Sequence, residues 1–329
     1  MYIISFTNNY NFHKSKSDKS IKNKTIIEEI EFFKYEQKDF CEKPNKYMNK
    51  RYEKEIDLFK VKFNGINYQM YLYNSPNFLR NEIIKSGYFE YSIGINMIEA
   101  LKFYSLKKNI INSKDIFILD IGGNVGWYPS LLGRYNYSIL SFESLEKNNY
   151  VGKKNYCYLN KNSNVIIIPY GLGNEAKICH YFSHIYKGGN GMIKCGRNNT
   201  IINKKLQNVF YEVGKVEIKT LKHFIPFLAN KNIALIKIDV EGHELKVLEG
   251  GLELITKFHV PFIVLEFTPH GLIEHGSKPR NLIELFVCND YKISMKGFLS
   301  QAYINMEQLL SIGDVQNNIY FIHKSILNY

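Results

Sequence analysis

The sequence has no apolar run long enough to cross a membrane. A transmembrane helix needs roughly 18 consecutive apolar residues, and the 45% of residues that are hydrophobic are distributed in shorter runs. The first residues, MYIISFTNNYNFHKSK, also lack the basic start, long apolar stretch and small-residue cleavage site of a signal peptide. These absences lead us to expect a soluble, cytoplasmic protein without a membrane span.

Cysteine is sparse and shows neither a metal-binding nor a disulfide pattern. No C-x-x-C pair occurs, and no histidine stands near a cysteine at zinc spacing. An odd number of cysteines fits a reducing compartment better than a secreted disulfide framework. We therefore expect reduced, mostly buried thiols at the five positions, which are Cys41, Cys157, Cys179, Cys195 and Cys288.

Arginine is also rare, which bears on the net charge of +12. Lysine and arginine together number 43, yet only five of these are arginines. Bidentate recognition of phosphate and guanine favours arginine. The excess of Lys, Asn, Ile and Tyr is more typical of coding bias in an AT-rich genome than of a binding face. Nucleic acid is therefore a less favoured acceptor than a small molecule.

The chain divides into two regions by composition. Residues 1–54 form a polar, lysine-rich extension with one expected helix at Lys24–Phe40, and we interpret this extension as flexible or loosely docked. Residues 55–329 form the folded domain. It begins with FKVKF and INYQMYLY on either side of Asn64-Gly65, which predicts a β-hairpin. A helix is expected next, at Asn96–Ser105.

Apolar runs then alternate with helical segments. This alternation predicts an α/β fold with a doubly wound, mostly parallel sheet and helices on both faces. A late strand at Ile319–Ile322 is expected to close one edge of the sheet. The other expected strands are Ile116–Asp120, Ser138–Glu143, Val165–Pro169, Ala234–Asp239 and Phe262–Glu266.

A glycine-rich turn follows the first of these strands, in IFILD-IGGNVG. Glycine lets the backbone approach a ligand, and the N-terminus of the next helix presents free N–H groups. The spacing D-x-G-x-x-x-G differs from the G-x-G-x-x-G of dinucleotide sites. Its acid would repel a pyrophosphate but suits the ammonium of an amino-acid group. We interpret the turn as a cofactor site, with a tight strand-to-helix connection as the alternative. Its residues are Asp120, Gly122, Gly123, Asn124 and Gly126.

An acid also ends the second strand, 23 residues after Asp120, at Glu143. A carboxylate at the tip of this strand can accept both ribose hydroxyls of a nucleoside-like cofactor. The alternative is an acid that stabilises the N-terminus of the following helix. Glu146 can fill that role, so we favour ribose binding for Glu143.

Two charged residues interrupt the apolar strand of IALIKIDVEGHELKVLEGG. Lys237 and Asp239 lie two residues apart and therefore on one face of the strand. Burying either charge alone would cost several kcal/mol, on the order of the penalty for an unpaired ion, so the two must pair or bind a ligand. His243 follows, and a solvated place in a helical first turn explains it as well as a role in catalysis. Glu266 ends the next strand before His270, and it either lines an acceptor site or holds a loop.

Taken in order, these segments resemble the FkbM-type methyltransferases, a class I S-adenosylmethionine-dependent family. The resemblance spans roughly Ile56–Ile322 and excludes the N-terminal extension. Gly123 departs from the family, where alanine is common, and Pro129 after the turn is another departure. The segments that carry the resemblance are GYFE (Gly87–Glu90), LDIGGNVGWY, the Phe142-Glu143 pair, PYGLGN, VEIKTL and KIDVEGHELKVLEGG.

The resemblance implies a class I methyltransferase fold and S-adenosylmethionine as the cofactor. Asp120 and the Gly122–Gly126 turn would hold its methionine end, and Glu143 its ribose. The turn at Gly171 and Leu172 would lie near the adenine, while Asp239 and the residues after it would face the transferred methyl group. The family mostly methylates hydroxyl oxygens of sugars and polyketide-type metabolites. This implies an O-methyltransferase with a glycan or small-molecule acceptor.

An acceptor hydroxyl is a poor nucleophile until its proton leaves, so a nearby base helps. Asp239, with Lys237 as its charged partner, is the first candidate, and His243 is the second because its ordinary pKa suits neutral pH. A divalent metal held by Asp239, Glu241 and Glu266 would be another way to activate the hydroxyl. We rank that route below the metal-free one.

Two other functions stand as alternatives. A ribose 2′-O-methyltransferase acting on RNA fits the basic charge. Such enzymes often use a Lys-Asp-Lys-Glu tetrad with lysine at the end of the fifth strand, where this chain has Glu266. The other alternative is a non-catalytic scaffold on the same fold, and the intact cofactor residues argue against it.

Overall fold

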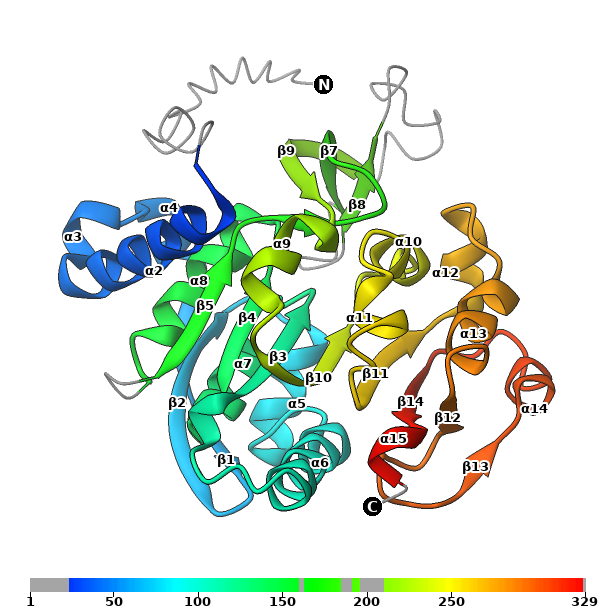
Figure 1. Ribbon diagram of the computed structural model, residues 1–329. Coiled ribbons are helices and arrows are strands. Elements are labelled where there is room, and N and C mark those ends of the chain that lie inside the picture. The colour runs from blue at the N-terminus through cyan, green and yellow to red at the C-terminus, as the bar shows by residue number, and fades with distance from the viewer. Residues whose placement is uncertain (1–23, 160–162, 185–190, 196–209, 328–329) are drawn as a thin grey trace, which may run out of the picture.

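The computed structural model describes residues 24–159, 163–184, 191–195 and 210–327 of the chain. Its centre is an eight-stranded sheet with helices on both faces (Figure 1). The α/β fold predicted from the sequence is therefore confirmed. In spatial order the strands are β13 (Tyr303–Ile304), β12 (Tyr291–Ser294), β14 (Asn317–His323), β11 (Phe262–Phe267), β10 (Asn232–Ile238), β3 (Ile116–Ile121), β4 (Ser138–Phe142) and β5 (Asn164–Ile168).

Five neighbouring strands, β11, β10, β3, β4 and β5, run parallel, and they correspond to the five expected from the apolar runs. The late strand expected at Ile319–Ile322 lies in β14, which is antiparallel to both β11 and β12. It is therefore inside the sheet, and the prediction that it closes an edge is wrong. The strands beyond it, β12 and β13, have only four and two residues, too few to show an apolar period.

Alternate side chains of the central strands enter two separate hydrophobic cores. In β3, Phe117, Leu119 and Ile121 pack on one face, and Ile116 and Ile118 pack on the other. A sheet that is buried on both faces needs strands that are apolar throughout, which explains the continuous apolar runs of the sequence. The helices that pack on the first face are α2 (Ile26–Glu42), α9 (Leu221–Leu228), α10 (Glu244–Glu249), α11 (Glu253–Thr256), α12 (Pro269–Glu274), α13 (Pro279–Val287) and α14 (Met306–Leu310).

The second face is covered by a hairpin and a further group of helices. The hairpin consists of β1 (Ile56–Phe63) and β2 (Ile66–Tyr73), joined by Asn64 and Gly65, which both have positive φ. This confirms the hairpin prediction, since such a two-residue turn needs positive φ twice. The helix expected after the hairpin is α6 (Tyr91–Lys107). The other helices on this face are α5 (Phe78–Ser86), α7 (Trp127–Gly133), α8 (Glu146–Tyr156) and α15 (Lys324–Leu327).

A second, four-stranded sheet follows β5 in the chain and was not predicted from the sequence. It stands next to α9 at the top of Figure 1, and its strand order is β6-β9-β7-β8. No helix among the described residues has the length and apolar character to cross a membrane. The remaining elements are β6 (Gly171–Leu172), β7 (Lys177–His184), β8 (Gly191–Lys194), β9 (Phe210–Lys219), α3 (Pro44–Tyr47), α4 (Lys50–Glu53) and a 3₁₀ turn at Ser113–Asp115.

The helix expected in the N-terminal extension is present as α2, and it is packed against the central sheet. Ile26, Ile30 and Phe33 of α2 enter the first core. The interpretation of a flexible or loosely docked extension is therefore wrong for this helix, whose apolar residues recur at helical spacing. Residues 1–23 lie outside the described part of the chain, and the boundary at residues 54 and 55 stays a prediction.

Four of the five cysteines form disulfides, Cys41–Cys157 and Cys179–Cys195, and Cys288 is free and exposed. The prediction of reduced thiols is wrong for these four. The first pair is 116 residues apart in the sequence, so no local spacing could reveal it. Disulfides persist mainly in oxidising compartments. The expectation of a cytoplasmic protein therefore loses the support that it drew from the cysteines.

Candidate active site

The central sheet has a topological switch point between β3 and β10. The chain continues from β3 to β4 and β5 on one side, whereas β10 leads to β11 on the other. In open α/β sheets, ligands bind in the crevice at the carboxyl ends of the strands beside such a point. A cavity of about 900 Å³ lies there, lined by residues of both sheets. The predicted site residues that line it are Gly122, Asn124, Glu143, Gly171, Leu172, Asp239 and His243.

The other four predicted residues, Asp120, Gly123, Gly126 and Lys237, do not line the cavity. Gly123 and Gly126 instead shape the turn that carries the lining residues. Gly126 has a φ of +80°, and a Cβ on Gly123 would lie 2.2 Å from the hydroxyl oxygen of Ser141. The clash with Ser141 explains why this chain has glycine at position 123, where the family commonly has alanine.

Asp120 lies beneath the turn and is fully buried. Its Oδ2 accepts a hydrogen bond of 2.7 Å from the Ser141 hydroxyl, whereas its Oδ1 has no hydrogen-bond partner among the described residues. Burial raises the pKa of Asp120. A buried acceptor without a donor is costly, and a nearby ammonium would satisfy it. A contact of Asp120 with the cofactor stays a prediction.

Glu143 follows β4 and places its carboxylate in the cavity wall. Oε2 accepts from the backbone N–H of Asn124 at 2.8 Å, and Oε1 accepts from that of Leu145 at 2.7 Å. Burial raises the pKa of Glu143 to about 7, against the effect of these hydrogen bonds. Each oxygen keeps further acceptor capacity, so the carboxylate can also accept two hydroxyl groups of a ligand.

Lys237 and Asp239 form the ion pair expected at the end of β10. The Lys237 ammonium lies 3.1 Å from Oδ2 of Asp239 and 3.3 Å from the carbonyl oxygen of Gly122. Although burial opposes it, the carboxylates of Asp239, Asp120 and Glu90 raise the pKa of Lys237. The lysine side chain is 10% exposed and that of Asp239 is 32% exposed. The carboxylate therefore faces the cavity, while the ammonium holds it from behind.

His243 lines the cavity at the N-terminus of α10. The centroid of its ring lies 3.9 Å from the ring centroid of His275. Burial, helped by the charges of His275 and Lys246, lowers the pKa of His243 to about 4. The expectation of an ordinary histidine pKa is therefore wrong, because the ring loses water on entering the cavity wall. At neutral pH the imidazole is uncharged and only weakly basic.

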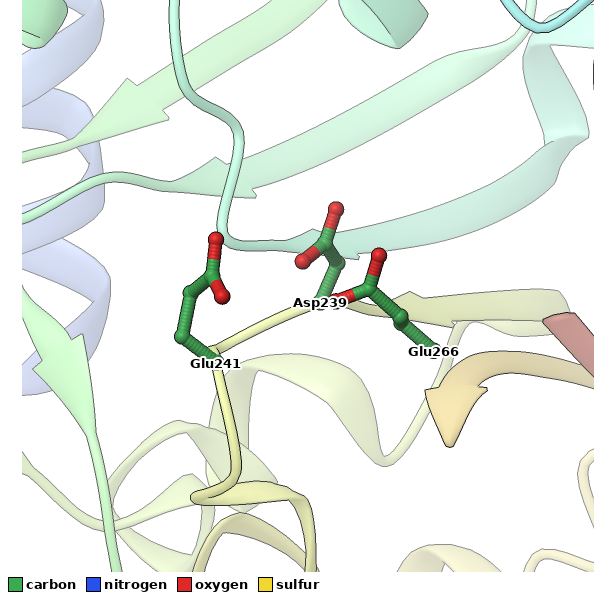
Figure 2. A group of neighbouring side chains, drawn as sticks. All are labelled: Asp239, Glu241 and Glu266. Carbon is green, nitrogen blue, oxygen red and sulfur yellow. The ribbon is translucent and has the colours of Figure 1, made fainter. Parts of the chain in front are cut away.

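Three carboxylates, those of Asp239, Glu241 and Glu266, converge at the ends of β10 and β11. One oxygen from each lies within 4.8 Å of the others, and Figure 2 shows the three side chains turned toward a common space. This spacing could hold a divalent cation. Burial and the charge of Asp239 raise the pKa of Glu241 and, further, that of Glu266. Protonation therefore relieves part of the repulsion between the three groups.

Glu266 was expected either to line the acceptor site or to hold a neighbouring loop by hydrogen bonds, and His270 was placed in the loop that follows it. Glu266 accepts a hydrogen bond from the side chain of Gln316 and does not line the cavity, which favours its loop-holding role. His270 lines the cavity rim, and its backbone N–H donates to Asp314 at 2.8 Å.

Of the cavity wall that comes from the small sheet, sequence reasoning predicted only Gly171 and Leu172 of β6 and missed the rest. Tyr181, Ile193, Cys195 and Ile218 line the cavity from β7, β9 and the region of β8. These residues are scattered over a segment without regular apolar spacing, so only strand pairing brings them together. Tyr170, which joins β5 to the small sheet, also lines the cavity and was missed.

Comparison with known sequences identifies the family. The profile of the Methyltransferase FkbM domain matches residues 120–293, just over half of the chain and the whole of the site region from Asp120 onward. The chain belongs to this family. This FkbM-domain chain is also 31% identical over 183 residues to Methyltransferase 1 of Beauveria bassiana (strain ARSEF 2860), an alignment that covers 49% of this chain and 72% of that protein. Both findings identify the chain as a methyltransferase.

Solved structures similar to this FkbM-domain chain are more distant. The bifunctional kinase-methyltransferase WbdD matches with a TM-score of 0.37 and 12% identity, over 70% of this chain and 38% of that one. A TehB-like SAM-dependent methyltransferase from Corynebacterium glutamicum matches with a TM-score of 0.34 and 9% identity, over 74% of this chain and 94% of that one.

Proposed function

We propose that this chain is an S-adenosylmethionine-dependent O-methyltransferase whose acceptor is a hydroxyl group of a glycan or a small molecule. One observation carries the proposal. A single cavity at the switch point of the sheet is lined by the Gly122 turn, by the Glu143 carboxylate and by the Asp239 carboxylate. The turn lets a ligand approach the backbone closely, Glu143 can accept hydrogen bonds from hydroxyl groups, and Asp239 can accept a proton, at the place where ligands bind in open α/β sheets.

The chain's own residues fit the cofactor at three places. Glu143 would accept the ribose hydroxyls, because its carboxylate is oriented by two backbone N–H groups and still has acceptor capacity. Gly171 and Leu172 would flank the adenine, and the Gly122 turn with Asp120 would take the methionine end. S-adenosylmethionine, when bound, supplies an activated methyl group.

Asp239 is the proposed general base. Its carboxylate lines the cavity and is fixed by Lys237 at 3.1 Å, so it is oriented before an acceptor arrives. As the acceptor oxygen gains the methyl group, Asp239 takes up the proton that the hydroxyl loses. Alignment of the hydroxyl contributes as well, since holding two reacting groups in line replaces a costly encounter. His243, with its lowered pKa, is the weaker candidate.

The decisive experiment has two steps. Isothermal titration with S-adenosylhomocysteine tests the cofactor site, and the absence of binding would favour the non-catalytic scaffold. Incubation with methyl-labelled cofactor and separate pools of glycans, small metabolites and RNA then tests the acceptor. We expect label in the glycan or small-molecule pool. Alkali-resistant label on RNA ribose would instead support the ribose 2′-O-methyltransferase.

A further inference from the structure

A buried carboxylate of the N-terminal helix reaches the wall of the cofactor cavity. Glu29 lies in the first turn of α2, and its side chain is only 3% exposed. Oε1 accepts a hydrogen bond of 2.5 Å from the hydroxyl of Tyr170, and Oε2 lies 2.8 Å from Nε2 of His223 on α9. Glu29 and Tyr170 are 141 residues apart in the chain. The two hydrogen bonds satisfy a carboxylate that would otherwise be costly to bury.

Tyr170 occupies the position between α2 and the cavity. It lines the cavity beside Gly171 and Leu172, the residues proposed to flank the adenine. On the other side, its ring packs edge-to-face against the ring of Phe33, with 5.7 Å between the two ring centroids. Because the hydroxyl is bonded to Glu29, the ring is held at both its edge and its tip. The geometry of this cavity wall therefore depends on α2.

The helix itself is anchored at two further points. The side-chain amide of Gln37 donates to the carbonyl oxygen of Val165 at 2.7 Å and accepts from the N–H of Ile167 at 2.9 Å. These are the backbone groups that β5, at the edge of the sheet, would otherwise offer to a neighbouring strand. The Cys41–Cys157 disulfide then ties the far end of α2 to the residue that follows α8.

We infer that Glu29 is a positioning residue for the cofactor: through the hydroxyl of Tyr170 it fixes the wall on which the adenosine part of the ligand rests. The helix α2, which lies outside the family-matched residues 120–293, is then a working part of the site. A ring that is already fixed loses no conformational freedom when the ligand binds, and such preorganisation strengthens binding. This inference rests on the proposed function.

The test measures ligand affinity, so it needs no acceptor. S-adenosylhomocysteine and 5′-methylthioadenosine, which has the adenosine part without the amino acid, are titrated into the full chain by calorimetry. We expect Tyr170→Phe and Glu29→Leu each to weaken both ligands by roughly three- to thirtyfold, the range of one to two lost hydrogen bonds. The double variant should be no weaker than the worse single one, since both changes remove the same bond.

Two further variants separate positioning from general damage. Glu29→Gln keeps an acceptor oxygen and should retain most of the affinity, whereas Glu31→Gln alters an exposed acid of the same helix that pairs with Lys34 and should have no effect. If Glu29→Leu does not fold, Tyr170→Phe, which removes one oxygen atom, carries the test. Unchanged affinity in Tyr170→Phe, or a loss for S-adenosylhomocysteine but not for 5′-methylthioadenosine, would overturn the inference. Failure of the parent chain to bind S-adenosylhomocysteine would instead reject the proposed function.

Discussion

Gly122 and Asp239 meet at the switch point of the sheet so closely that no side chain fits between them. A Cβ on Gly122 would lie 1.8 Å from the carbonyl oxygen of Asp239. The N–H of Asp239 in turn donates to the carbonyl oxygen of Ile121 at 3.0 Å. The turn that would hold the methionine end and the strand end that carries the proposed base are therefore one rigid unit.

This contact predicts a large effect of Gly122→Ala. The variant combines a positive φ of +84° with a clash against backbone that cannot rotate away. Gly65 provides a matched control, because its φ is +80° and a Cβ there would meet nothing within 4 Å. We expect Gly65→Ala to lower the free energy of unfolding by about 1 kcal/mol, from φ alone, and Gly122→Ala to lower it by several times as much. Urea unfolding measures both, and equal losses would show that the contact is relieved by movement.

Glu143 should make the stability of the ligand-free protein depend on pH. Burial raises its pKa to about 7, above the value in the unfolded chain, so the folded state binds the extra proton. Stability should therefore fall as the pH rises from about 4.5 to 7, by on the order of 3 kcal/mol from this group. Glu143→Gln should remove this group's contribution to the pH dependence and be more stable than the parent at pH 8. It should also bind S-adenosylhomocysteine about tenfold to a hundredfold more weakly. A Glu143→Gln variant whose stability changes with pH over this window just as the parent's does would contradict the assignment.

The strand ends of the site could be predicted from the sequence because local rules place them. Asp120, Glu143 and Asp239 each end an apolar run, and the carboxyl ends of parallel strands meet at one edge of a sheet. The Lys237–Asp239 pair could be predicted because two charges in an apolar strand must compensate each other. The FkbM resemblance that rests on these segments is confirmed by the family match over residues 120–293.

The remaining parts of the site depend on contacts between distant segments. The bond from Glu29 to Tyr170 spans 141 residues, and the Cys41–Cys157 disulfide spans 116. No local period encodes either contact. The lowered pKa of His243 depends on such contacts as well, since its largest cause is burial and the charge of His275, 32 residues further along the chain, adds to it.

Lys237 should be essential for stability, and the cost of losing it should depend on pH. Lys237→Met would leave Asp120, Asp239 and Glu90 without their shared cation, and breaking a buried pair typically costs about 3–5 kcal/mol. Burial raises the pKa values of Asp120 and Glu90, so these acids take up protons readily once the lysine is gone. The destabilisation should therefore be smaller at pH 5 than at pH 8. Urea unfolding at the two pH values measures it, with Lys222→Met, on the exposed side of α9, as the control. A pH-independent loss would mean that packing, not charge, is what Lys237 supplies.

The base assignment predicts different results for two neighbouring residues of the cavity. Asp239→Asn keeps the shape of the side chain but removes the proton acceptor, so it should lower the turnover number by about 10²–10⁴-fold, the usual contribution of positioned proton transfer. Its affinity for S-adenosylhomocysteine should change little, because Glu143 and the Gly122 turn are intact. His243→Ala should keep most of the turnover and the pH profile of the parent near pH 6.5, because burial already lowers the pKa of His243 to about 4.

The same assays separate the metal-free route from a cation held by Asp239, Glu241 and Glu266. On the metal-free route, EDTA leaves the turnover unchanged, and Glu266→Gln has a small effect because burial keeps a proton on Glu266 near neutral pH. Activity that is lost in EDTA and restored by Mg²⁺ would assign the three carboxylates to a metal, which would then polarise the acceptor hydroxyl. In that case Glu241→Gln and Glu266→Gln should lose activity together with Asp239→Asn, and raising the Mg²⁺ concentration should recover part of it. Full activity of Asp239→Asn in the presence of EDTA would reject both routes and leave alignment of the acceptor as the source of catalysis.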